Sequence, residues 1–544
     1  MQDNWSGPVD DVVRVDGHSL SLAQVAETAR TPQRRAVVLC AEAERRMRRS
    51  VDVKERLVDA GVPLYGVTAG FGDSNTRQIS GAKAAALQTN LVRFLSCGVG
   101  PHAADEVVRA TMLIRANCLA RGHSALRPHV VRLLLDCLNA GLLPLVPERG
   151  SVGASGDLIP LSYLANLLTG QGEVRCAGEV VPSATALERA GLEPVELVAK
   201  EGLALLNGTS FMSAFAALAV HDARRLAFAS EVCTALTSRV TVGNPGHFAP
   251  FVFAHKPHPG TARSAAVVRT LLGSAAAEPR AAEPEAAGQD GGPGVPEAGY
   301  RQLDRPIQDR YSIRCAPHVT GVLRDTLSWV EPWIGTEVNS TNDNPLFDAD
   351  TGRVHNGGNF YGGHVGQAMD ALRTAVAGVA DLLDRQLQLV VDEKFNNGLT
   401  PNLIPRFPED SREAGLHHGF KGMQLAASAL AAEALHLTMP ATSFSRSTEA
   451  HNQDKVSMGT IAARHTRTAV DLTLRLTAIH LLALCQAADL RGTDVLSPEL
   501  RRVHALVRKV SPFVEGDRAL EHDITAVADL VRGGALDLED EPAG

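Results

Sequence analysis

Residues 150–160 combine residue types that could build a chemical group out of the backbone itself. The segment reads GSVGASGDLIP and lies between two apolar flanks. In a tight bend the amide nitrogen of Gly156 can reach the carbonyl carbon of Ala154, because glycine has no Cβ to block the approach. Loss of the Ser155 hydroxyl then leaves an exocyclic methylene. We predict that Ala154, Ser155 and Gly156 form 4-methylidene-imidazol-5-one (MIO), a carbon electrophile of a kind that side chains do not supply.

The residue types of this segment bear on three other interpretations. A phosphate-binding loop needs Gly-Lys-Ser/Thr after its glycines, and residues 150–160 contain no lysine. A hydrolase nucleophile elbow needs G-x-S-x-G, but Asp157 occupies the second glycine position and no strand is expected before the segment. An ordinary glycine turn stays open on composition alone.

Further polar and glycine-rich motifs follow one another along the chain. They lie at 65–72 (YGVTAGFG), 206–209 (LNGT), 308–314 (QDRYSIR), 339–345 (NSTNDNP), 357–360 (GGNF) and 452–454 (NQD). Together with residues 150–160 they resemble, in the same order, the motifs of the histidine, phenylalanine and tyrosine ammonia-lyases and the related aminomutases. The resemblance covers roughly residues 15–530. It implies a carbon–nitrogen lyase that deaminates an aromatic L-amino acid with no external cofactor.

The resemblance assigns roles to residues that could bind the substrate and remove its proton. A base must lie directly against the β-proton, because the pKa of that proton is far above that of any side chain. Tyr65 is the expected base, on a glycine-flanked loop that could move as a lid. Arg314 should hold the substrate carboxylate with two parallel donors. Tyr311, one helical turn earlier, should assist the electrophile or the leaving amine, and Gln308 should continue the same helical face.

The resemblance also assigns residues to the prosthetic group and the pocket. Asn207 resembles the donor to the carbonyl oxygen of the prosthetic group, where negative charge grows. Glu449 and Gln453 are four residues apart, so on a helix both would face the substrate amine. The histidine lyases typically carry Glu where Gln453 stands, which argues against imidazole as substrate. Asn342 and Phe360 resemble further pocket residues. Turns, ion pairs and core packing are the structural alternatives for these residues.

Substrate choice is assigned to Phe94 and Leu95. By the same resemblance, tyrosine lyases carry His-Leu at these two positions and histidine lyases carry Ser-His. An apolar pair buries a phenyl ring but leaves a para-hydroxyl or an imidazole nitrogen without a partner, a loss of about 1–3 kcal/mol. The expected reaction is therefore the conversion of L-phenylalanine to trans-cinnamate and ammonia.

Two enzymatic alternatives and one non-enzymatic alternative remain open. An aromatic 2,3-aminomutase shares the same residues and returns the amine to the β-carbon, and tyrosine ammonia-lyase is the other enzymatic alternative. The sequence departs from the family pattern at Ala69, Asp73, His318 and Tyr361, which could change specificity. A non-catalytic helical scaffold is the third alternative, although a scaffold has no need of such a polar set.

Helical periodicity must position these residues. Apolar residues recur at spacings of three and four over 372–390, namely Leu372, Val376, Val379, Leu383, Leu387 and Val390, which predicts a long core helix. Similar patterns cover 211–236, 316–334 and 460–488, and strand-like alternation is confined to short pieces such as 171–182. The predicted fold class is mainly α. The resemblance implies a long central helix bundle of the fumarase/aspartase-like type, with a smaller mixed N-terminal domain that carries the electrophile.

Three domains are expected along the chain. Residues 1–210 should form an N-terminal domain that carries the glycine-flanked inner loop with Tyr65 and the electrophile at 154–156. Residues 211–510 should form the central helical domain. Within the latter, residues 274–299 are rich in Ala, Pro, Glu and Gly, a composition that predicts a flexible loop. Residues 511–544 should form a C-terminal helix and an acidic tail.

Composition limits the classes of partner. The 544 residues carry a formal net charge of −8 without a basic stripe, so neither nucleic acid nor a membrane surface is expected. No apolar run of membrane-spanning length and no signal peptide is expected, which predicts a cytoplasmic protein. The eight cysteines form no C-x-x-C pair and predict buried thiols, and no metal is expected because H-E-x-x-H is missing. The resemblance implies a homotetramer in which each active site draws on three chains and binds a small aromatic amino acid.

Overall fold

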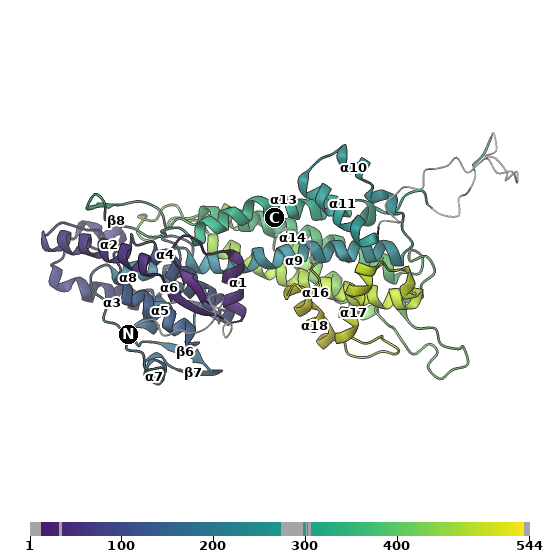
Figure 1. Cartoon of the computed structure of the whole chain (residues 1–544), viewed down its shortest axis with the longest axis horizontal. Helices are drawn as coiled ribbons and strands as arrows, with labels where there is room; N and C mark the ends of the chain where they lie inside the picture. Colours follow the sequence, from purple (N-terminus) through teal and green to yellow (C-terminus); the bar gives the residue numbers. More distant parts are fainter. Residues whose placement is uncertain (1–11, 32–34, 274–297, 301, 303–305, 538–544) are drawn as a thin grey trace. The chain divides into compact units, whose positions relative to one another are not determined.

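The computed structural model of the chain describes residues 12–31, 35–273, 298–300, 302 and 306–537 (Figure 1). The chain divides into two compact units. Unit 1 comprises Met1–His221, Val330–Ala371 and Met439–Arg467, and unit 2 comprises Asp222–Trp329, Leu372–Thr438 and Thr468–Gly544. The domain division expected at residues 210 and 510 stays a prediction. The loop expected at 274–299 and the acidic tail lie almost entirely outside the described residues.

Four long helices confirm the predicted mainly helical fold. They are α9 (Ser210–Val240), α13 (Ala316–Val338), α14 (Gly363–Val391) and α16 (Gly459–Arg491), and each contains one of the predicted apolar stripes. Every apolar residue of the stripe predicted over 372–390 is fully buried. Since a three-and-four spacing places side chains on one face of a helix, the sequence pattern alone was enough to predict the buried face of α14.

Within unit 2 the long helices are joined by buried polar contacts as well as apolar packing. Glu231 on α9 accepts two hydrogen bonds of 2.6 Å from the Arg324 guanidinium on α13. Gln386 on α14 donates to the Thr234 hydroxyl on α9 at 2.9 Å. Burial lowers the pKa of His480 on α16 to about 3, so this core histidine is neutral. The shorter helices of unit 2 are α10 (Pro250–Ala254), α11 (Pro259–Leu272), α12 (Tyr311–Arg314), α15 (Lys421–His436), α17 (Pro498–Val510) and α18 (Glu521–Arg532), with 3-10 turns η4 (Pro245–Phe248), η6 (Pro401–Leu403) and η8 (Thr493–Val495).

The sequence was expected to contain no apolar run long enough to span a membrane, and α16 contradicts this expectation. By length and composition alone this helix could cross a membrane. However, 78% of its most apolar window is buried inside the structure. A helix that is apolar on all sides is also what the centre of a helix bundle requires.

Unit 1 mixes helices with short strands. Its helices are α1 (Leu22–Arg30), α2 (Ala41–Asp59), α3 (Ala84–Leu95), α4 (Asp105–Ala120), α5 (Pro128–Asn139), α6 (Leu158–Leu168), α7 (Ser183–Arg189) and α8 (Glu201–Leu206), with 3-10 turns η2 (Gly72–Thr76), η3 (Gly81–Lys83) and η7 (Ala441–Phe444). Its strands are β1 (Val12–Val15), β2 (Ala36–Leu39), β3 (Val99–His102), β4 (Leu143–Pro144), β5 (Pro147–Arg149), β6 (Glu173–Cys176), β7 (Glu179–Pro182), β8 (Leu346–Asp348) and β9 (Arg353–His355).

The strands of unit 1 form small sheets. β1 and β2 pair in parallel, whereas β3 pairs with β5 and β8 with β9 in antiparallel fashion. In the remaining sheet β6 is the central strand and pairs antiparallel with both β4 and β7. The β6–β7 hairpin, with Val174 opposite Val181, confirms the strand pattern predicted at 171–182. Sheets of this size cannot form a core of their own, so the core of unit 1 is built mainly by its helices.

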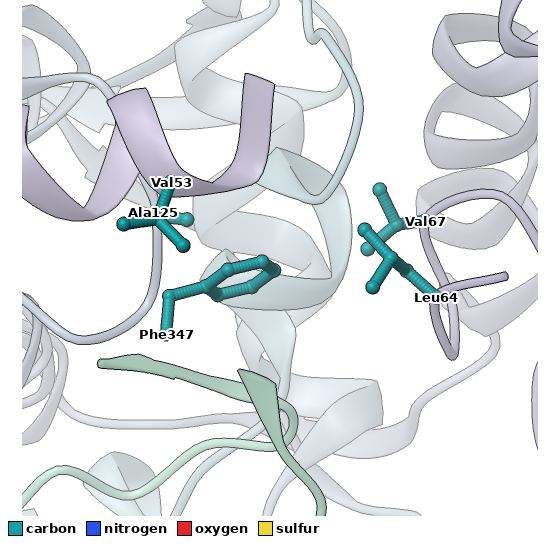
Figure 2. Packing of buried hydrophobic residues seen from close by; sticks show 5 residues of the cluster. All are labelled: Val53, Leu64, Val67, Ala125 and Phe347. Atoms are coloured by element: carbon teal, nitrogen blue, oxygen red, sulfur yellow. The ribbon is translucent and has the colours of Figure 1, made fainter. Parts of the chain in front are cut away.

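A small apolar cluster anchors the loop that carries Tyr65. Figure 2 shows the Phe347 ring between Val53 and Ala125 on one side and Leu64 and Val67 on the other, all of them buried. Leu64 and Val67 flank the Tyr65–Gly66 turn in the sequence. The base of this loop is therefore held in the hydrophobic core, whatever movement its tip makes.

A buried ion pair lies close to the start of α8. The Lys200 ammonium donates to both carboxylate oxygens of Asp343 at 2.8 Å, and both side chains are completely buried. Burial lowers the pKa of Lys200, and the Asp343 charge opposes this effect. Asp343 also accepts the Asn344 amide at 2.7 Å. The pair connects the 339–345 motif to the segment leading into Asn207.

We expect Lys200→Met to lower the free energy of unfolding by about 3–5 kcal/mol, because it leaves a buried carboxylate without its cation. Denaturant unfolding followed by circular dichroism measures the change. The matched control is Lys200→Met/Asp343→Asn, which removes the orphaned charge but keeps an acceptor for the Asn344 amide, and it should recover a large part of the loss. A Lys200→Met variant as stable as the parent would show that the ion pair contributes nothing.

Candidate active site

The reactive segment forms a turn between a strand and a helix. β5 ends at Arg149 and α6 begins at Leu158. The expectation that no strand precedes the segment was therefore wrong, because a three-residue strand is too short to show alternation. Asp157 at the second glycine position still separates the segment from a nucleophile elbow.

Gly156 meets a steric requirement that only glycine satisfies. Its φ is +72°, and a Cβ at this position would collide with the backbone of Gly208. Gly156 and Gly208 form a parallel bridge, and the Asp157 amide donates to the Gly208 carbonyl at 2.7 Å. The turn at 154–156 is thus bent against the 207–209 segment with no side chain between the two backbones.

Asp157 holds the far end of this turn, a role that the sequence argument missed. The carboxylate is fully buried and accepts the Met212 amide at 2.8 Å, the Ser151 hydroxyl at 2.9 Å and the Thr460 hydroxyl. Burial raises its pKa to about 6, and these hydrogen bonds work in the opposite direction. The only sequence signal was an acidic residue directly before an apolar helix start.

Asn207 is hydrogen-bonded to the backbone of Ser155. It follows the last residue of α8, and its Nδ2 donates to the Ser155 carbonyl oxygen at 3.1 Å. If Gly156 nitrogen closes onto Ala154, the carbonyl group of Ser155 becomes the carbonyl group of the ring. The Asn207 amide therefore donates to the same carbonyl oxygen for which the resemblance predicts a donor.

Residues 448–453 form a strained turn and not the helix on which Glu449 and Gln453 were expected to share a face. Thr448 and Gln453 pair across the turn. Between them Glu449, Ala450 and His451 have φ values of +51°, +49° and +64°. Left-handed backbone costs an L-residue about 1–2 kcal/mol, so the surroundings must hold this turn. A spacing of four residues cannot distinguish a helix from such a turn.

This turn contacts both halves of the predicted chemistry. The Gln453 Nε2 donates to the Ser155 hydroxyl at 3.2 Å. The Glu449 carboxylate packs so closely on Gly72 that a Cβ there would collide with it. The Gly72 amide in turn donates to the Tyr65 hydroxyl at 3.0 Å. The predicted base and the predicted electrophile are therefore connected through one short loop.

The environment of Tyr65 opposes ionisation of its hydroxyl. Burial raises the pKa of Tyr65, the Gly72 amide lowers it, and the Glu449 carboxylate raises it again. Burial and the negative charge of Asp73 raise the pKa of Glu449, while a hydrogen bond from the Asp73 amide lowers it. Asp73, noted above as a departure from the family pattern, therefore acts on this cluster.

Phe94 and Leu95 point in different directions at the end of α3. Phe94 is 61% exposed, whereas Leu95 is 9% exposed and packs inward. Successive helical residues lie about 100° apart, so the two cannot present one flat apolar wall. α3 packs beside α8 through the Leu203 amide, which donates to Gln88 Oε1 at 2.9 Å. Only Phe94 is accessible at the surface of the chain, and Leu95 belongs to the core.

Asn342 and Phe360 differ in their accessibility. Asn342 is 2% exposed, and its Nδ2 donates to the Thr209 hydroxyl at 2.6 Å and to the Glu337 carbonyl at 3.2 Å. In this chain it supports the 207–209 segment from the interior and does not line an open surface. Phe360 is partly exposed, shortly before α14 begins.

Gln308, Tyr311 and Arg314 belong to unit 2, whereas the other predicted site residues belong to unit 1. α12 is a single turn from Tyr311 to Arg314, and the Arg314 guanidinium lies 4.5 Å from the centre of the Tyr311 ring. Gln308 precedes this turn in a bend, so the predicted continuous helical face was wrong. Arg314 Nε donates to the Asp309 carbonyl at 3.0 Å, and Tyr311 is 72% exposed.

The cysteines and the metal prediction can be compared with the described part of the chain. Cys118, Cys137, Cys233 and Cys485 are buried, whereas Cys97 is exposed, so burial was predicted correctly for half of the thiols. Within the described ranges, His, Cys, Asp and Glu side chains form no group of three that could hold a metal ion.

Comparison with known proteins assigns the chain to a family. A family model described as aromatic amino acid lyase matches residues 20–509. A histidine ammonia-lyase of Gloeobacter violaceus is 41% identical over 97% of each chain, and a tyrosine ammonia-lyase of Cupriavidus metallidurans is 41% identical over 96% of each. A MIO-dependent tyrosine 2,3-aminomutase of Streptomyces globisporus is 38% identical, covering 96% of this chain and 95% of that protein. The solved structure of tyrosine aminomutase from that organism superimposes with a TM-score of 0.88 at 36% identity, covering 96% of this chain and 97% of that one. The chain belongs to the aromatic amino acid lyase family.

Proposed function

We propose that this protein is an ammonia-lyase that converts L-phenylalanine to trans-cinnamate and ammonia, using MIO formed from Ala154, Ser155 and Gly156. The observation that carries the proposal is the 448–453 turn. It contacts the Ser155 hydroxyl through Gln453 and the Tyr65 cluster through Glu449. A fold without catalysis has no reason to connect a strained turn, a reactive serine and a half-buried tyrosine.

The residues around Ser155 fit the prosthetic group. Once formed, MIO supplies an electrophilic methylidene carbon that lets a poor leaving group such as an amine depart. Gly156 has no side chain to obstruct ring closure, and the Gly208 backbone closes the space behind it. Asn207 donates to the Ser155 carbonyl oxygen, where it stabilises negative charge.

The remaining side chains bind the substrate and remove its proton. Tyr65 removes the β-proton, and Glu449 lies close enough to influence both that base and a bound ammonium group. Arg314 holds the carboxylate with its planar fork, with Tyr311 and Gln308 beside it. The pocket is completed by Gln453 and Phe360. Asn342 supports the pocket from the interior, beneath the 207–209 segment.

The relatives named above act on histidine and tyrosine, so the choice of substrate depends on the pocket. Phe94 is the residue that favours phenylalanine, because a phenyl wall offers no hydrogen bond to a para-hydroxyl or an imidazole. Tyrosine is the second candidate, supported by the 41% identity to a tyrosine ammonia-lyase. Return of the amine to the β-carbon is the other alternative, supported by the likeness to the aminomutase of Streptomyces globisporus.

One experiment tests substrate and outcome together. The purified protein is incubated separately with L-phenylalanine, L-tyrosine and L-histidine, and all products are resolved by chromatography. Free trans-cinnamate from phenylalanine, with slower turnover of the other two, is the expected result. A β-amino acid product would identify an aminomutase, and preferred turnover of tyrosine would reassign the substrate.

Replacing Phe94 with histidine should move the preference towards tyrosine. A histidine offers the partner that a para-hydroxyl lacks, so the ratio of kcat/KM for tyrosine over phenylalanine should rise by about 10- to 200-fold. Steady-state kinetics on both substrates measures the ratio. Val180→His, on the exposed face of β7, is the matched control and should leave the ratio unchanged. An unchanged ratio in Phe94→His would remove Phe94 from the specificity argument.

We further propose that the protein acts as a cytoplasmic homotetramer in which each active site takes residues from three chains. Support comes from Phe94 and Tyr311, two aromatic side chains assigned to the substrate site that are largely exposed in the single chain. Large aromatic side chains are normally covered in the working protein. Small-angle scattering or sedimentation of the purified protein measures the assembly.

Complementation tests whether sites are shared. Tyr65→Phe and Arg314→Ala should each be inactive alone. Unfolded together in equal amounts and refolded, they should recover activity, because about a quarter of the sites then receive an intact tyrosine and an intact arginine from different chains. Mixed protein as inactive as its two parents would mean that both residues come from one chain.

A further inference from the structure

Arg115 is a buried cation within the core of unit 1. It lies on α4, and its side chain is 1% exposed. Nη2 donates to the Ala204 carbonyl and Nη1 to the Asn342 carbonyl at 3.4 Å, while Nε has no partner. Among the residues that the structure describes, no carboxylate lies within ion-pair distance of this guanidinium. Both hydrogen bonds of the guanidinium therefore go to backbone carbonyls.

Such an arrangement is unfavourable for stability on its own. Removing a guanidinium from water costs several kcal/mol even after relaxation, and a direct carboxylate partner normally offsets part of that cost. Burial lowers the pKa of Arg115, and the charges of Asp343 and Asp157 oppose this effect. Both acids are already engaged, Asp343 by Lys200 and Asp157 by three hydrogen-bond donors. An apolar side chain of similar volume would suit this position better if packing were its only role.

The guanidinium lies against the backbone that holds the reactive turn. A Cβ on Gly208 would collide with Nη1 of Arg115 and come close to the Asn342 carbonyl. The Gly208 carbonyl accepts the Asp157 amide at 2.7 Å, and Gly208 bridges to Gly156. Gly208 therefore touches Arg115 and also touches the turn at 154–156. A shift of Arg115 would be passed directly to that turn.

We infer that Arg115 is a positioning residue for ring closure at Ala154–Gly156, an inference that rests on the proposed function. Arg115 holds Gly208, and Gly208 holds the Asp157 amide, so the nitrogen of Gly156 stays bent towards the carbonyl carbon of Ala154. Two contacts to two different carbonyls fix the plane of the guanidinium, which a single ammonium could not do. The same contact leaves no room for a side chain at position 208.

The step that Arg115 positions is balanced without an external reagent. A bond forms between the Gly156 nitrogen and the Ala154 carbonyl carbon. The Ala154 oxygen leaves as one water with the protons of the Gly156 and Ser155 amides. The Ser155 hydroxyl leaves as a second water with the proton of its own Cα. The product has lost two waters and has been neither oxidised nor reduced.

Two variants of Arg115 and one matched control test the inference. Arg115→Lys keeps the charge but offers only one point of contact, and Arg115→Met keeps the volume without charge. Arg373→Met on α14 is the control, because Arg373 is a second arginine that is fully buried. Each protein is purified as a folded species by size exclusion, its thermal unfolding is recorded, and it is digested. Mass spectrometry of the peptide that contains residues 150–160 then gives the fraction that has lost two waters.

We expect the cyclised fraction to fall by about tenfold or more in both Arg115 variants, since a displacement near 1 Å is enough to slow an intramolecular reaction strongly. Arg373→Met should cyclise like the parent even where its thermal stability is lower. If Arg115→Met fails to fold, Arg115→Lys alone decides. A cyclised fraction in folded Arg115→Lys equal to that of the parent overturns the inference.

The parent protein separates this inference from the proposed function. Its own peptide is measured first and should lack two waters. A parent peptide that retains both waters contradicts the proposed function itself, and the inference on Arg115 with it. A cyclised parent with cyclised Arg115 variants contradicts only the role of Arg115.

Discussion

Replacing Ser155 with alanine should lower turnover of L-phenylalanine by at least about 1,000-fold, because the alanine Cβ carries no hydroxyl that can leave as water, so no methylidene can form. The fold should be retained. Ser155 is only partly buried, and its hydroxyl accepts one 3.2 Å hydrogen bond from Gln453, so alanine removes little packing. Product formation is followed by the absorbance of cinnamate, and folding by circular dichroism.

Two controls make the Ser155→Ala result specific. Ser151→Ala removes a hydroxyl of the same turn that donates to Asp157 and to the Gly156 carbonyl oxygen. Neither acceptor atom forms or loses a bond in ring closure, so this variant should retain far more activity. The mass of the 150–160 peptide should show the loss of two waters in the parent and in Ser151→Ala but not in Ser155→Ala. Activity of Ser155→Ala equal to that of the parent would disprove the proposed chemistry.

Tyr65→Phe should lower kcat by about 100- to 10,000-fold, the contribution typical of a positioned general base. The ring and its packing are kept, so only the hydroxyl is tested. The Gly72 amide loses its acceptor, which costs about 1–3 kcal/mol locally. Ring formation at residues 154–156 should be unaffected, and the peptide mass measures it independently of turnover. A Tyr65→Phe variant with parental kcat would assign the base elsewhere.

The pH profile supplies a further measurement on the same residue. A base works in its ionised form, and burial raises the pKa of Tyr65 above its ordinary value of 10. Because the ionised fraction grows as pH approaches that pKa from below, kcat/KM should rise with pH across the alkaline range until the fold fails. Glu449→Gln removes a negative charge that raises this pKa, so the rise should shift to lower pH, whatever the overall rate. An unshifted profile would mean that Glu449 does not act on Tyr65.

The helical framework could be predicted from the sequence because its signal is local. The three-and-four spacing over 372–390 predicted both the helix and its buried face, and every residue of that stripe is fully buried. The chemistry proposed at 154–156 also rests on a local pattern, a serine between two small residues, and it stays a prediction. Local sequence information was insufficient where a helix and a turn are both compatible with the same spacing. Glu449 and Gln453 were expected on a helix, but they lie in a strained turn.

The supports of the site could not be predicted, because each depends on contacts between segments far apart in the chain. Arg115 and Asp157 both contact the backbone around Gly208. Arg115 lies in no motif, and Asp157 lies in the 150–160 motif without any local sign of the contacts that it makes. Similarly, Phe94 and Leu95 are adjacent in sequence, and only their packing shows that one is exposed and the other is buried.

By itself the sequence determined the family and the mainly helical fold, since these depend on residue type, order and periodicity, and the assignment of Ala154, Ser155 and Gly156 as the reactive triplet stays a prediction. Tertiary structure decided which backbone presses on that triplet, which donor meets the Ser155 oxygen and how the 448–453 turn reaches both Ser155 and the Tyr65 cluster. The physical reason is that periodicity acts over a few residues, whereas hydrogen bonds and steric contacts depend on distance in space. A glycine such as Gly208 shows the difference, because its necessity appears only once Arg115 and Asn342 are placed against it.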